Sequence, residues 1–524
     1  MFDLRHARCW AVAALAAAVA ILSGCATTLA VDPAKQAPKA NESVVVVTIT
    51  SNTAQMTAID TLTVRRSHED DNFVLQRIAP GLARDTSLFV GVMPAGDYDF
   101  LQFDNFDKHL YLAISTGMRE HLGHFHVVAG QATDLGRVIM TQVNSHVMLG
   151  RSTLVTDNVA LMTNFAPQEL QFFQGKTSTG WITPRSATDR VEEYAQQCPV
   201  GADGLVELPD GRLAAGSRLG NVLVREKDGR WRAIRSGVLH SVLSVMPVDR
   251  QDAVLIAVGE FDTILRLPRW DGGMEVVDPG NLPPGSLVFI DGNDHDGWYV
   301  GLQQENDLQL LHSARLDHGD WTSVAHDPMP KNTFFGGNQA WFWRLPGGLA
   351  YAMTSGRIRR LDYASGRWTE SHAPNNDNLG KITLNPDGSL AILTSPGGGF
   401  GGVLASLYLS TDFGATWTKV ESDFNVSMNP PFRTRKGTLL VPGGVFGKQE
   451  IHASTDGGKT WQARGEFPVF RQLLTTPTQG LLGIEAGLYG RNFGIWHSAD
   501  EGASWTLEYS NFDRVAYDLE HQNK

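Results

Sequence analysis

Three eight-residue stretches near the end of the chain share one pattern. They are Ser410-Thr411-Asp412-Phe413-Gly414-Ala415-Thr416-Trp417, Ser454-Thr455-Asp456-Gly457-Gly458-Lys459-Thr460-Trp461 and Ser498-Ala499-Asp500-Glu501-Gly502-Ala503-Ser504-Trp505. Each has serine, aspartate, glycine and tryptophan at its first, third, fifth and eighth positions, and the serines are 44 residues apart in both intervals. A complete motif at constant spacing indicates an internal structural repeat.

The pattern resembles the Asp-box, the bacterial neuraminidase repeat Ser-x-Asp-x-Gly-x-x-Trp. In that family the aspartate accepts backbone N–H bonds in the turn between the two outer strands of a blade. The glycine allows positive φ, and the tryptophan packs between adjacent sheets. The resemblance therefore implies a structural role, not a catalytic one, for Ser410, Asp412, Gly414, Trp417, Ser454, Asp456, Gly458, Trp461, Ser498, Asp500, Gly502 and Trp505.

Degenerate copies of the motif lie upstream, at residues 227–231, 268–273, 316–321 and 363–368. Copies follow apolar stretches with small residues, and seven such stretches recur about every 45 residues: 213–216, 255–259, 298–301, 349–352, 390–393, 439–442 and 481–484. A period of this size predicts a β-propeller over residues 201–524. We expect seven blades, with six or eight as alternatives, and ring closure through residues 514–519 or the segment near Trp181.

The rest of the chain also reads as all-β, because 54 glycines and 24 prolines punctuate short apolar runs. The β-branched run at 43–50 has strong strand character. Strands are further expected at 61–65, 87–92, 98–103, 125–128 and 136–142, which predicts a small β-sandwich over residues 43–150. The phrases at 93–98 and 129–136 resemble prealbumin-like sandwich modules of bacterial surface lipoproteins.

A partly helical connector is expected over residues 151–200. Helices are predicted at 166–173 and 188–197, the second capped by Thr188 with Asp189 near its positive end. Val191, Tyr194 and Ala195 fall on one helical face, and Pro199 ends the helix.

The amino terminus has the form of a signal peptide. Arg5 and Arg8 precede an apolar run of about 12 residues, shorter than the roughly 20 needed to span a bilayer. The run ends in Leu22-Ser23-Gly24-Cys25, which resembles the lipobox of bacterial lipoproteins. The resemblance implies removal of residues 1–24 and lipidation of Cys25; the alternative is an ordinary secretory peptide that contains a cysteine.

The lipobox resemblance also implies a location in the cell envelope. Ala26, as second residue of the mature chain, favours the outer membrane, on its periplasmic side or at the surface. Residues 25–42, rich in alanine, proline, lysine and threonine, are expected to form a tether that holds the folded body off the membrane.

Charge and cysteine content limit the functional classes. The formal net charge is −12, which argues against a nucleic-acid partner. Of three cysteines only Cys198 remains after processing and lipidation, so no internal disulfide is expected. We expect Cys198 to be buried, with a reactive or intermolecular thiol as the alternative.

Neither a metal nor a cofactor is expected. His121, His124 and His126 are close in sequence, but no further ligand has a recognisable spacing, which favours surface or partly buried histidines. The segment at 291–297 resembles a calcium loop in composition only and is interpreted as a hairpin turn.

Asp-box propellers include sialidases, sortilin-like receptors and the photosystem II assembly-factor family. The short, regular blades are most similar to the non-catalytic, assembly-factor-like kind. This implies a lipid-anchored envelope protein that binds or assembles, its propeller presenting a rigid surface to a protein, peptide or glycan. Fold by itself does not decide function.

The alternative function is a sialidase-like or other glycoside hydrolase acting on envelope or host glycans. Arg433 would then face the central funnel, and Glu485 and Tyr489 would form a Glu–Tyr pair. The sialidase Arg-Ile-Pro motif is absent from the first blade. Three arginines converging with a Tyr–Glu pair would favour hydrolysis, whereas a funnel of glycine, serine and apolar residues would favour binding.

Overall fold

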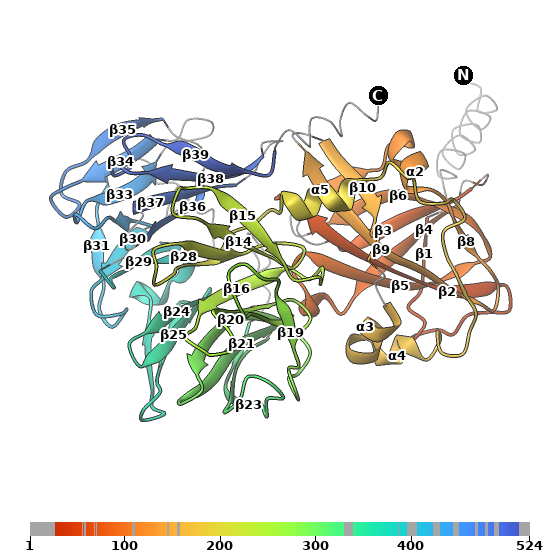
Figure 1. Ribbon diagram of the computed structural model, residues 1–524, viewed down its shortest axis with the longest axis horizontal. Coiled ribbons are helices and arrows are strands. Elements are labelled where there is room, and N and C mark those ends of the chain that lie inside the picture. Colours follow the sequence, from red (N-terminus) through yellow and green to blue (C-terminus); the bar gives the residue numbers. More distant parts are fainter. Residues whose placement is uncertain are drawn as a thin grey trace, which may run out of the picture.

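The computed structural model describes residues 27–512, except 55, 57–58, 68, 70, 107–109, 144–145, 155–157, 306, 330–338, 386, 396–405, 423–429, 444–449, 467–469, 477–479 and 487–491. The protein is all-β, as the sequence predicts. A sheet domain at the amino-terminal end, red to orange in Figure 1, packs against a seven-bladed β-propeller, yellow through green to blue.

The sheet domain is built on one 11-stranded sheet with the order β10-β9-β2-β5-β4-β3-β6-β7, in which β1 also pairs with β4, β8 with β6 and β11 with β9. Its strands are β1 Thr27–Leu29, β2 Glu42–Asn52, β3 Thr61–Arg66, β4 Asn72–Ile78, β5 Thr86–Pro94, β6 Gly96–Asn105, β7 Leu110–Ala113, β8 Phe125–Val127, β9 Ala132–Val143, β10 His146–Arg151 and β11 Ser178–Thr179. The β-branched run predicted as a strand lies in β2 and is buried.

One apolar core lies between the two halves of this sheet. Val47 of β2 and Val138 of β9 come from one half, and Leu62 of β3 and Phe100 of β6 come from the other; all four are buried in one cluster. Because both halves contribute to this cluster, the sheet curves around it. The finer prediction of a prealbumin-like sandwich stays a prediction.

Residues 27–31, at the start of the expected tether, lie against the sheet instead. β1 pairs in parallel with β4, and the Val92 N–H donates to the Val31 carbonyl at 2.9 Å. Ala30 is only 4% exposed and belongs to the core. The structure differs from the prediction here because the short run 28–31 can pair with the sheet and bury apolar surface.

The helices are short. They are α2 Thr116–Leu122, α3 Asn158–Phe165, α4 Pro167–Leu170 and α5 Val191–Gln197, with 3-10 turns η1 Pro80–Leu82 and η2 Pro374–Asn376. The predicted Thr188 cap is wrong: α5 begins at Val191, whose N–H donates to Asp189 Oδ1 at 3.1 Å. The predicted apolar face of this helix is correct, since Val191, Tyr194 and Ala195 are buried. No described helix has the length and apolarity to cross a bilayer.

The propeller consists of seven four-stranded antiparallel blades, each made from consecutive strands. Blade 1 consists of β12 Asp203–Glu207, β13 Leu213–Gly216, β14 Asn221–Arg225 and β15 Trp231–Arg235, and blade 2 of β16 Val242–Pro247, β17 Leu255–Gly259, β18 Ile264–Leu267 and β19 Glu275–Val277. Blade 3 consists of β20 Ser286–Asn293, β21 Gly297–Gln304, β22 Asp307–Ser313 and β23 Thr322–Pro328, and blade 4 of β24 Ala340–Leu345, β25 Gly348–Met353, β26 Arg357–Asp362 and β27 Trp368–His372.

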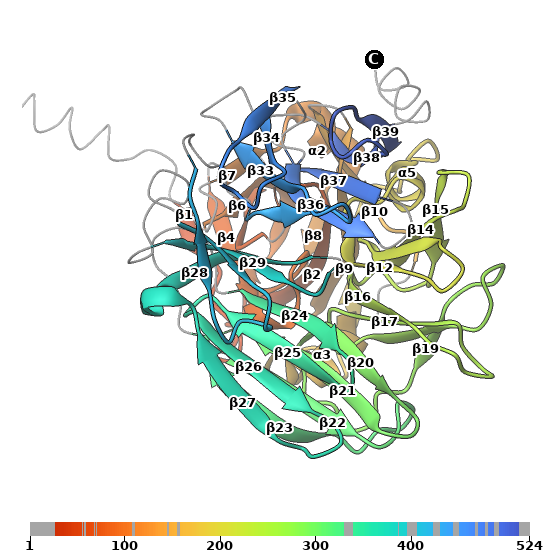
Figure 2. The same ribbon diagram turned by 90° about the vertical axis from the view of Figure 1, so that its left-hand side faces the viewer.

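Blade 5 consists of β28 Asn378–Leu384, β29 Leu390–Ser395, β30 Ser406–Ser410 and β31 Thr418–Val420. Blade 6 consists of β32 Phe432–Arg433, β33 Leu439–Gly443, β34 Glu450–Ser454 and β35 Gln462–Glu466, and blade 7 of β36 Phe470–Thr476, β37 Gly480–Ala486, β38 Phe493–Ser498 and β39 Thr506–Ser510. Each of the seven apolar stretches singled out in the sequence is the second strand of a blade. The expected count of seven is therefore confirmed, and Figure 2 shows the blades from the propeller side.

Side chains of blades 1 and 7 close the ring. Leu213 and Leu223 share a buried cluster with Leu482 and Ile495, and the Arg225 guanidinium pairs with Glu508 at 2.6 Å. Closure near Trp181 is a wrong prediction, because that indole packs in the sheet-domain core. The other candidate, 514–519, lies outside the described residues.

Candidate functional site

The propeller has two different faces. The four strands of a blade alternate in direction. One face of the propeller, here called the loop face, therefore carries the connections from the second to the third strand of each blade and from each blade to the next. Turns from first to second and from third to fourth strands share the opposite one, the box face. The sheet domain packs on the loop face over blades 1–3; for example, the Leu82 carbonyl accepts from Phe261 N at 3.1 Å and Ser286 Oγ at 2.9 Å.

On the box face, each complete Asp-box fastens its own turn. Asp456 Oδ1 accepts the Thr460 N–H at 2.9 Å and the Lys459 N–H at 3.0 Å, and Asp456 Oδ2 accepts Thr460 Oγ1 at 2.6 Å. Ser454 Oγ donates to Asp456 at 2.7 Å and accepts the Gly458 N–H at 2.8 Å. These bonds, above all the one from the Thr460 hydroxyl, hold the pKa of Asp456 far below its usual range.

The other two complete boxes repeat this geometry. Asp412 accepts from Thr416 N at 2.8 Å, and Asp500 accepts from Ser504 N at 2.8 Å. Ser410 and Ser498 accept the N–H groups of the box glycines at 2.7 and 2.8 Å. All three carboxylates are therefore occupied within their own turns.

The glycine and tryptophan of a box join its blade to the preceding one. Gly458 has φ +92°, and a Cβ there would lie 3.1 Å from Val420 Cγ1 of blade 5. Trp461 Nε1 donates to the Glu421 carbonyl at 2.9 Å, just after the last strand of blade 5. Trp505 likewise packs on a cluster shared by blades 6 and 7. The box is thus a clamp between neighbouring blades.

The degenerate copies occupy the same turn in blades 1 to 4, between third and fourth strands, but use other contacts. In blade 1, Asp228 Oδ1 accepts the Arg230 N–H at 3.1 Å. In blade 3, Ser313 Oγ accepts the Asp320 N–H at 3.0 Å, and Trp321 Nε1 donates to the Pro279 carbonyl at 2.8 Å. The position of the turn is kept although the motif is not.

The residues considered for glycoside hydrolysis are not brought together. Arg433 ends β32 at the box face, where its Nη1 lies 3.0 Å from Asp387 Oδ2 of blade 5. Glu485 lies toward the loop-face end of β37 and accepts Trp496 Nε1 at 2.9 Å. Tyr489 lies outside the described residues. Arg433 and Glu485 therefore sit at opposite ends of their strands, each with a partner of its own.

The three neighbouring histidines contact three different carboxylates. His124 Nδ1 pairs with Asp99 and His126 Nδ1 with Asp97, while His121 Nε2 lies 3.6 Å from Asp189. Within the described ranges, no three His, Cys, Asp or Glu side chains are grouped so as to hold a metal. The 291–297 segment contains the β20–β21 turn, and Cys198 is buried as expected.

A partly buried charge network connects the sheet domain to blade 1. Arg84 donates to both carboxylate oxygens of Asp203, at 3.1 and 2.7 Å, and to Asp85 Oδ2 at 3.0 Å. Arg218 of the propeller lies 3.3 Å from Asp85 Oδ1, and the Asp85 and Arg218 side chains are 0% and 3% exposed. Burial by itself would raise the pKa of Asp85, but Arg218 and Arg84 lower it to about 2.

Glu260 of blade 2 anchors the start of β5. Its side chain is fully buried and accepts the N–H groups of Asp85 and Thr86, the Thr86 hydroxyl at 2.8 Å and the Ser241 N–H at 3.1 Å. Next along the chain, Asp262 is partly buried, and burial raises its pKa to about 7. His240 stays neutral, because burial and Arg137 lower its pKa to about 3.

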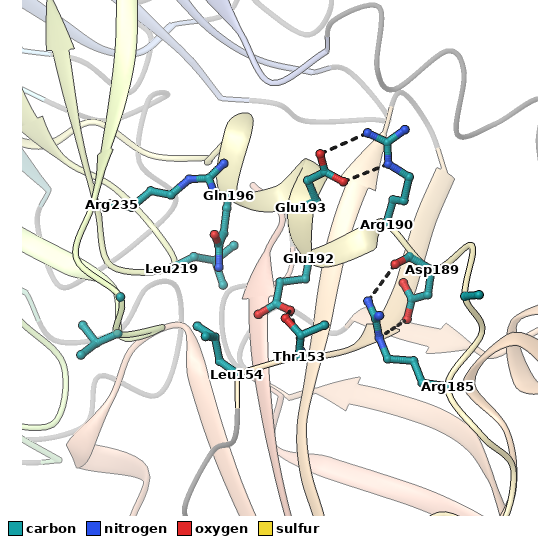
Figure 3. Close-up of a pocket in the computed structure, with 13 residues that line it drawn as sticks. Thr153, Leu154, Arg185, Asp189, Arg190, Glu192, Glu193, Gln196, Leu219 and Arg235 are labelled. Carbon is teal, nitrogen blue, oxygen red and sulfur yellow. Dashed lines mark hydrogen bonds and ion pairs between the residues drawn. The ribbon is translucent and has the colours of Figure 1, made fainter. Parts of the chain in front are cut away.

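A pocket of about 600 Å³ lies where α5 meets blade 1 (Figure 3). Its charged walls are largely paired: Arg190 Nε lies 2.9 Å from Glu193, and Arg185 Nε 3.2 Å from Asp189. The Glu192 carboxylate accepts hydrogen bonds from the Thr153 N–H and hydroxyl, both at 2.6 Å. No motif marks this pocket, which exists only because two distant parts of the chain meet.

Near the box face, Arg344 links three blades. It projects from β24, the first strand of blade 4, and donates to the carbonyls of Val245 in blade 2 at 3.1 Å and Ile290 in blade 3 at 2.7 Å. Asp291 lies 3.3 Å from its Nε and accepts the Tyr363 hydroxyl at 2.6 Å. Sequence reasoning missed Arg344; the sole signal is one arginine in an otherwise apolar strand, Ala340–Leu345.

Comparison with known proteins identifies one of the three complete Asp-boxes. The BNR/Asp-box repeat family model matches residues 452–463, and no curated protein matches the chain. Similar solved structures include "YCF48 bound to D1 peptide", with 15% identity and a TM-score of 0.37 over 51% of this chain and 82% of that one. Another is "YCF48 from Cyanidioschyzon merolae", with 12% identity and a TM-score of 0.39 over 55% and 93%.

A third similar structure is "Streptogramin B lyase structure", with 14% identity and a TM-score of 0.36 over 60% of this chain and 92% of that one. Because matches at this level accompany such different titles, they carry no argument about what this chain does.

Proposed function

We propose that this chain is a lipid-anchored cell-envelope protein whose propeller presents a rigid recognition surface to a protein, peptide or glycan. The observation that carries the proposal is the network of the buried Asp85, Arg218 and Glu260 with the partly exposed Arg84 and Asp203, which fixes the propeller on the sheet domain. Among the described residues, the contacts of the sheet domain lie on the loop face and leave the box-face turns open to a partner.

Rigidity favours binding because a pre-ordered surface loses little conformational entropy on association. The Asp-box clamps and the Arg344 contacts hold the box-face turns to one another across blades. Exposed side chains on these turns include Arg230 and Arg269, which are 84% and 79% exposed. A partner would meet a surface that is already in its bound shape.

The geometry gives less support to glycoside hydrolysis. That chemistry needs acid and nucleophile groups aimed at one bond. Arg433 and Glu485 instead lie toward opposite faces, and each is engaged by a neighbour. A recognition role needs no such convergence.

The test is affinity purification of the tagged, lipidated protein from gently crosslinked envelopes. Arg230→Glu with Arg269→Glu reverses two box-face charges whose ionic partners, Asp228 and Asp271, are in the same turns, so the fold should be unaffected. Lys35→Glu is the control, because Lys35 is equally exposed at 76% but lies in the sheet domain.

We expect a stoichiometric partner that the parent and Lys35→Glu retain and that the double variant loses by about tenfold or more, equivalent to about 1.4 kcal/mol. Equal recovery with all three proteins would contradict recognition at the box face. For the anchor, Cys25→Ser should abolish acylation and move the protein to the soluble fraction; unchanged membrane association would remove that part of the proposal.

A further inference from the structure

The folded body begins immediately after the proposed anchor. Cys25 is two residues before Thr27, the first residue of β1, so their Cα atoms are within about 7 Å. β1 is held by its pairing with β4, and the Ala30 N–H donates to the Val74 carbonyl at 2.9 Å. The acylated residue thus has almost no free chain between it and the sheet.

Strand register places this attachment at one end of the sheet domain. Thr27 pairs with Asn72 at the start of β4. At the same end, the Ser67 N–H donates to the Asp97 carbonyl at 2.7 Å, and the Gly130 N–H donates to the Glu42 carbonyl at 3.3 Å. We call this the distal end and define it by residues 39–42, 67, 69, 71, 94–97 and 128–131.

The distal end is far from the propeller. β2 starts there at Glu42 and runs 11 residues to Asn52, whose side chain accepts the N–H of Val200, just before blade 1, at 2.8 Å. At about 3.3 Å per residue this strand alone spans roughly 35 Å. The propeller, with its box face outermost, continues beyond it (Figure 1).

Charges at and beside the distal end are mostly matched. Lys39 lies 3.5 Å from Glu42 and Lys35 3.9 Å from Asp32. Arg66 lies 2.9 Å from Glu69, and His126 pairs with Asp97. Paired groups lower the electrostatic cost of bringing this end close to lipid headgroups, since few charges need to lose water without a partner.

We propose that the distal end rests on the lipid surface and that the box face points away from it. This inference depends on the proposed lipid anchor at Cys25. A flexible linker of 15 or so residues would let the body tumble over a range of roughly 20 Å, but the pairing of β1 removes that freedom. The membrane is therefore a docking partner of the sheet domain and sets the direction in which the propeller presents its surface.

The test uses the full, lipidated chain in phosphatidylethanolamine–phosphatidylglycerol vesicles that carry a headgroup quencher. A fluorophore is attached at Ala129→Cys in the distal end or at Lys459→Cys on the box face; both native residues are exposed. The parent chain, whose Cys198 is buried, measures background labelling. Because at least 35 Å or so of sheet separates the two labels, we expect strong quenching at 129 and about a tenth of it or less at 459.

A second variant separates anchoring from orientation. A flexible Gly-Ser linker of about 20 residues between Ala26 and Thr27 has an end-to-end distance of roughly 25 Å. It should leave vesicle flotation unchanged and bring quenching at 129 down toward that at 459. Equal quenching of both labels in a floating, unmodified protein overturns the orientation while the anchor stands. If the parent chain does not float with the vesicles and the Cys25→Ser variant behaves in the same way, the proposed anchor is overturned and the inference with it.

Discussion

Blades 5–7 and blades 1–3 are held in the ring by different means. In blades 5–7, a complete Asp-box closes each outer turn and clamps it to the preceding blade, as Asp456 and Trp461 do in blade 6. In blades 1–3 the boxes are degenerate, although Trp321 of blade 3 still donates to the Pro279 carbonyl just after blade 2. There the sheet domain also holds the loop face, through buried charges such as Asp85 and Glu260. Blade 4 has a degenerate box as well, and its Arg344 reaches blades 2 and 3.

The difference shows that a repeat protein can add a long-range clamp where the local one is reduced. A complete box needs only residues of one short segment and the neighbouring blade. Arg84 and Asp203, by contrast, are 119 residues apart, and Arg225 and Glu508 that close the ring are 283 apart.

The largest expected effect is loss of the long-range clamp. Arg218→Ala removes one of the two cations that face the buried Asp85 carboxylate, and breaking a buried pair from one side costs about 3–5 kcal/mol. Urea denaturation should show this loss in the free energy of unfolding. Arg269→Ala, which breaks a pair that is 79% and 82% exposed, should change it by about 0.5 kcal/mol or less.

A loss of stability from Arg218→Ala no larger than that of Arg269→Ala would show that the interface does not stabilise blades 1–3.

A smaller effect is expected at the local clamp. Gly458 and Gly457 both have positive φ, at +92° and +77°, but only at Gly458 would a new Cβ meet another blade, 3.1 Å from Val420. Positive φ costs a non-glycine residue about 1 kcal/mol, and crowding adds about another. Thermal unfolding should therefore give Gly458→Ala a lower melting temperature than Gly457→Ala. The opposite order of melting temperatures would argue against a clamp between blades.

The smallest effect expected is a difference in pH response. Asp262 has a pKa of about 7 in the folded protein and an ordinary value near 3.8 in the unfolded chain. Its contribution to the stability of the fold is therefore fully present below pH 3.8 and is lost as the pH rises through 7. Asp262→Asn should therefore stabilise the protein by about 1–2 kcal/mol at pH 8 and make its stability flatter between pH 5 and 8.

The matching control for pH lies in blades 5–7. Because the pKa of Asp456 is far below its usual range, Asp456→Asn should leave the pH dependence between 5 and 8 unchanged, whatever it does to stability itself. Denaturant titrations of Asp262→Asn and Asp456→Asn at pH 5 and pH 8 measure these two responses. An Asp262→Asn protein whose stability keeps the parent pH dependence would refute the burial of this carboxyl.

Much of the propeller was predictable because its signals are local. Seven apolar stretches at regular intervals mark the second strands, and even degenerate copies of the box fall in the expected turn. The start of helix α5 was predicted three residues too early, because Thr188 and Asp189 could both accept the first N–H groups and only Asp189 accepts one, from Val191. The start of the tether was misjudged because a strand as short as Thr27–Leu29 forms only when a partner edge is available.

The sequence by itself determined the all-β class and the repeat and favoured seven blades over six or eight, since strand pattern and turn chemistry depend on neighbours in the chain. Only the tertiary structure decided how the ring closes, which face is covered and where Arg433 and Glu485 lie relative to each other. The same holds for the network of Arg84, Asp85 and Arg218. These charges carry no motif, because their pairing depends on which distant segments burial brings together.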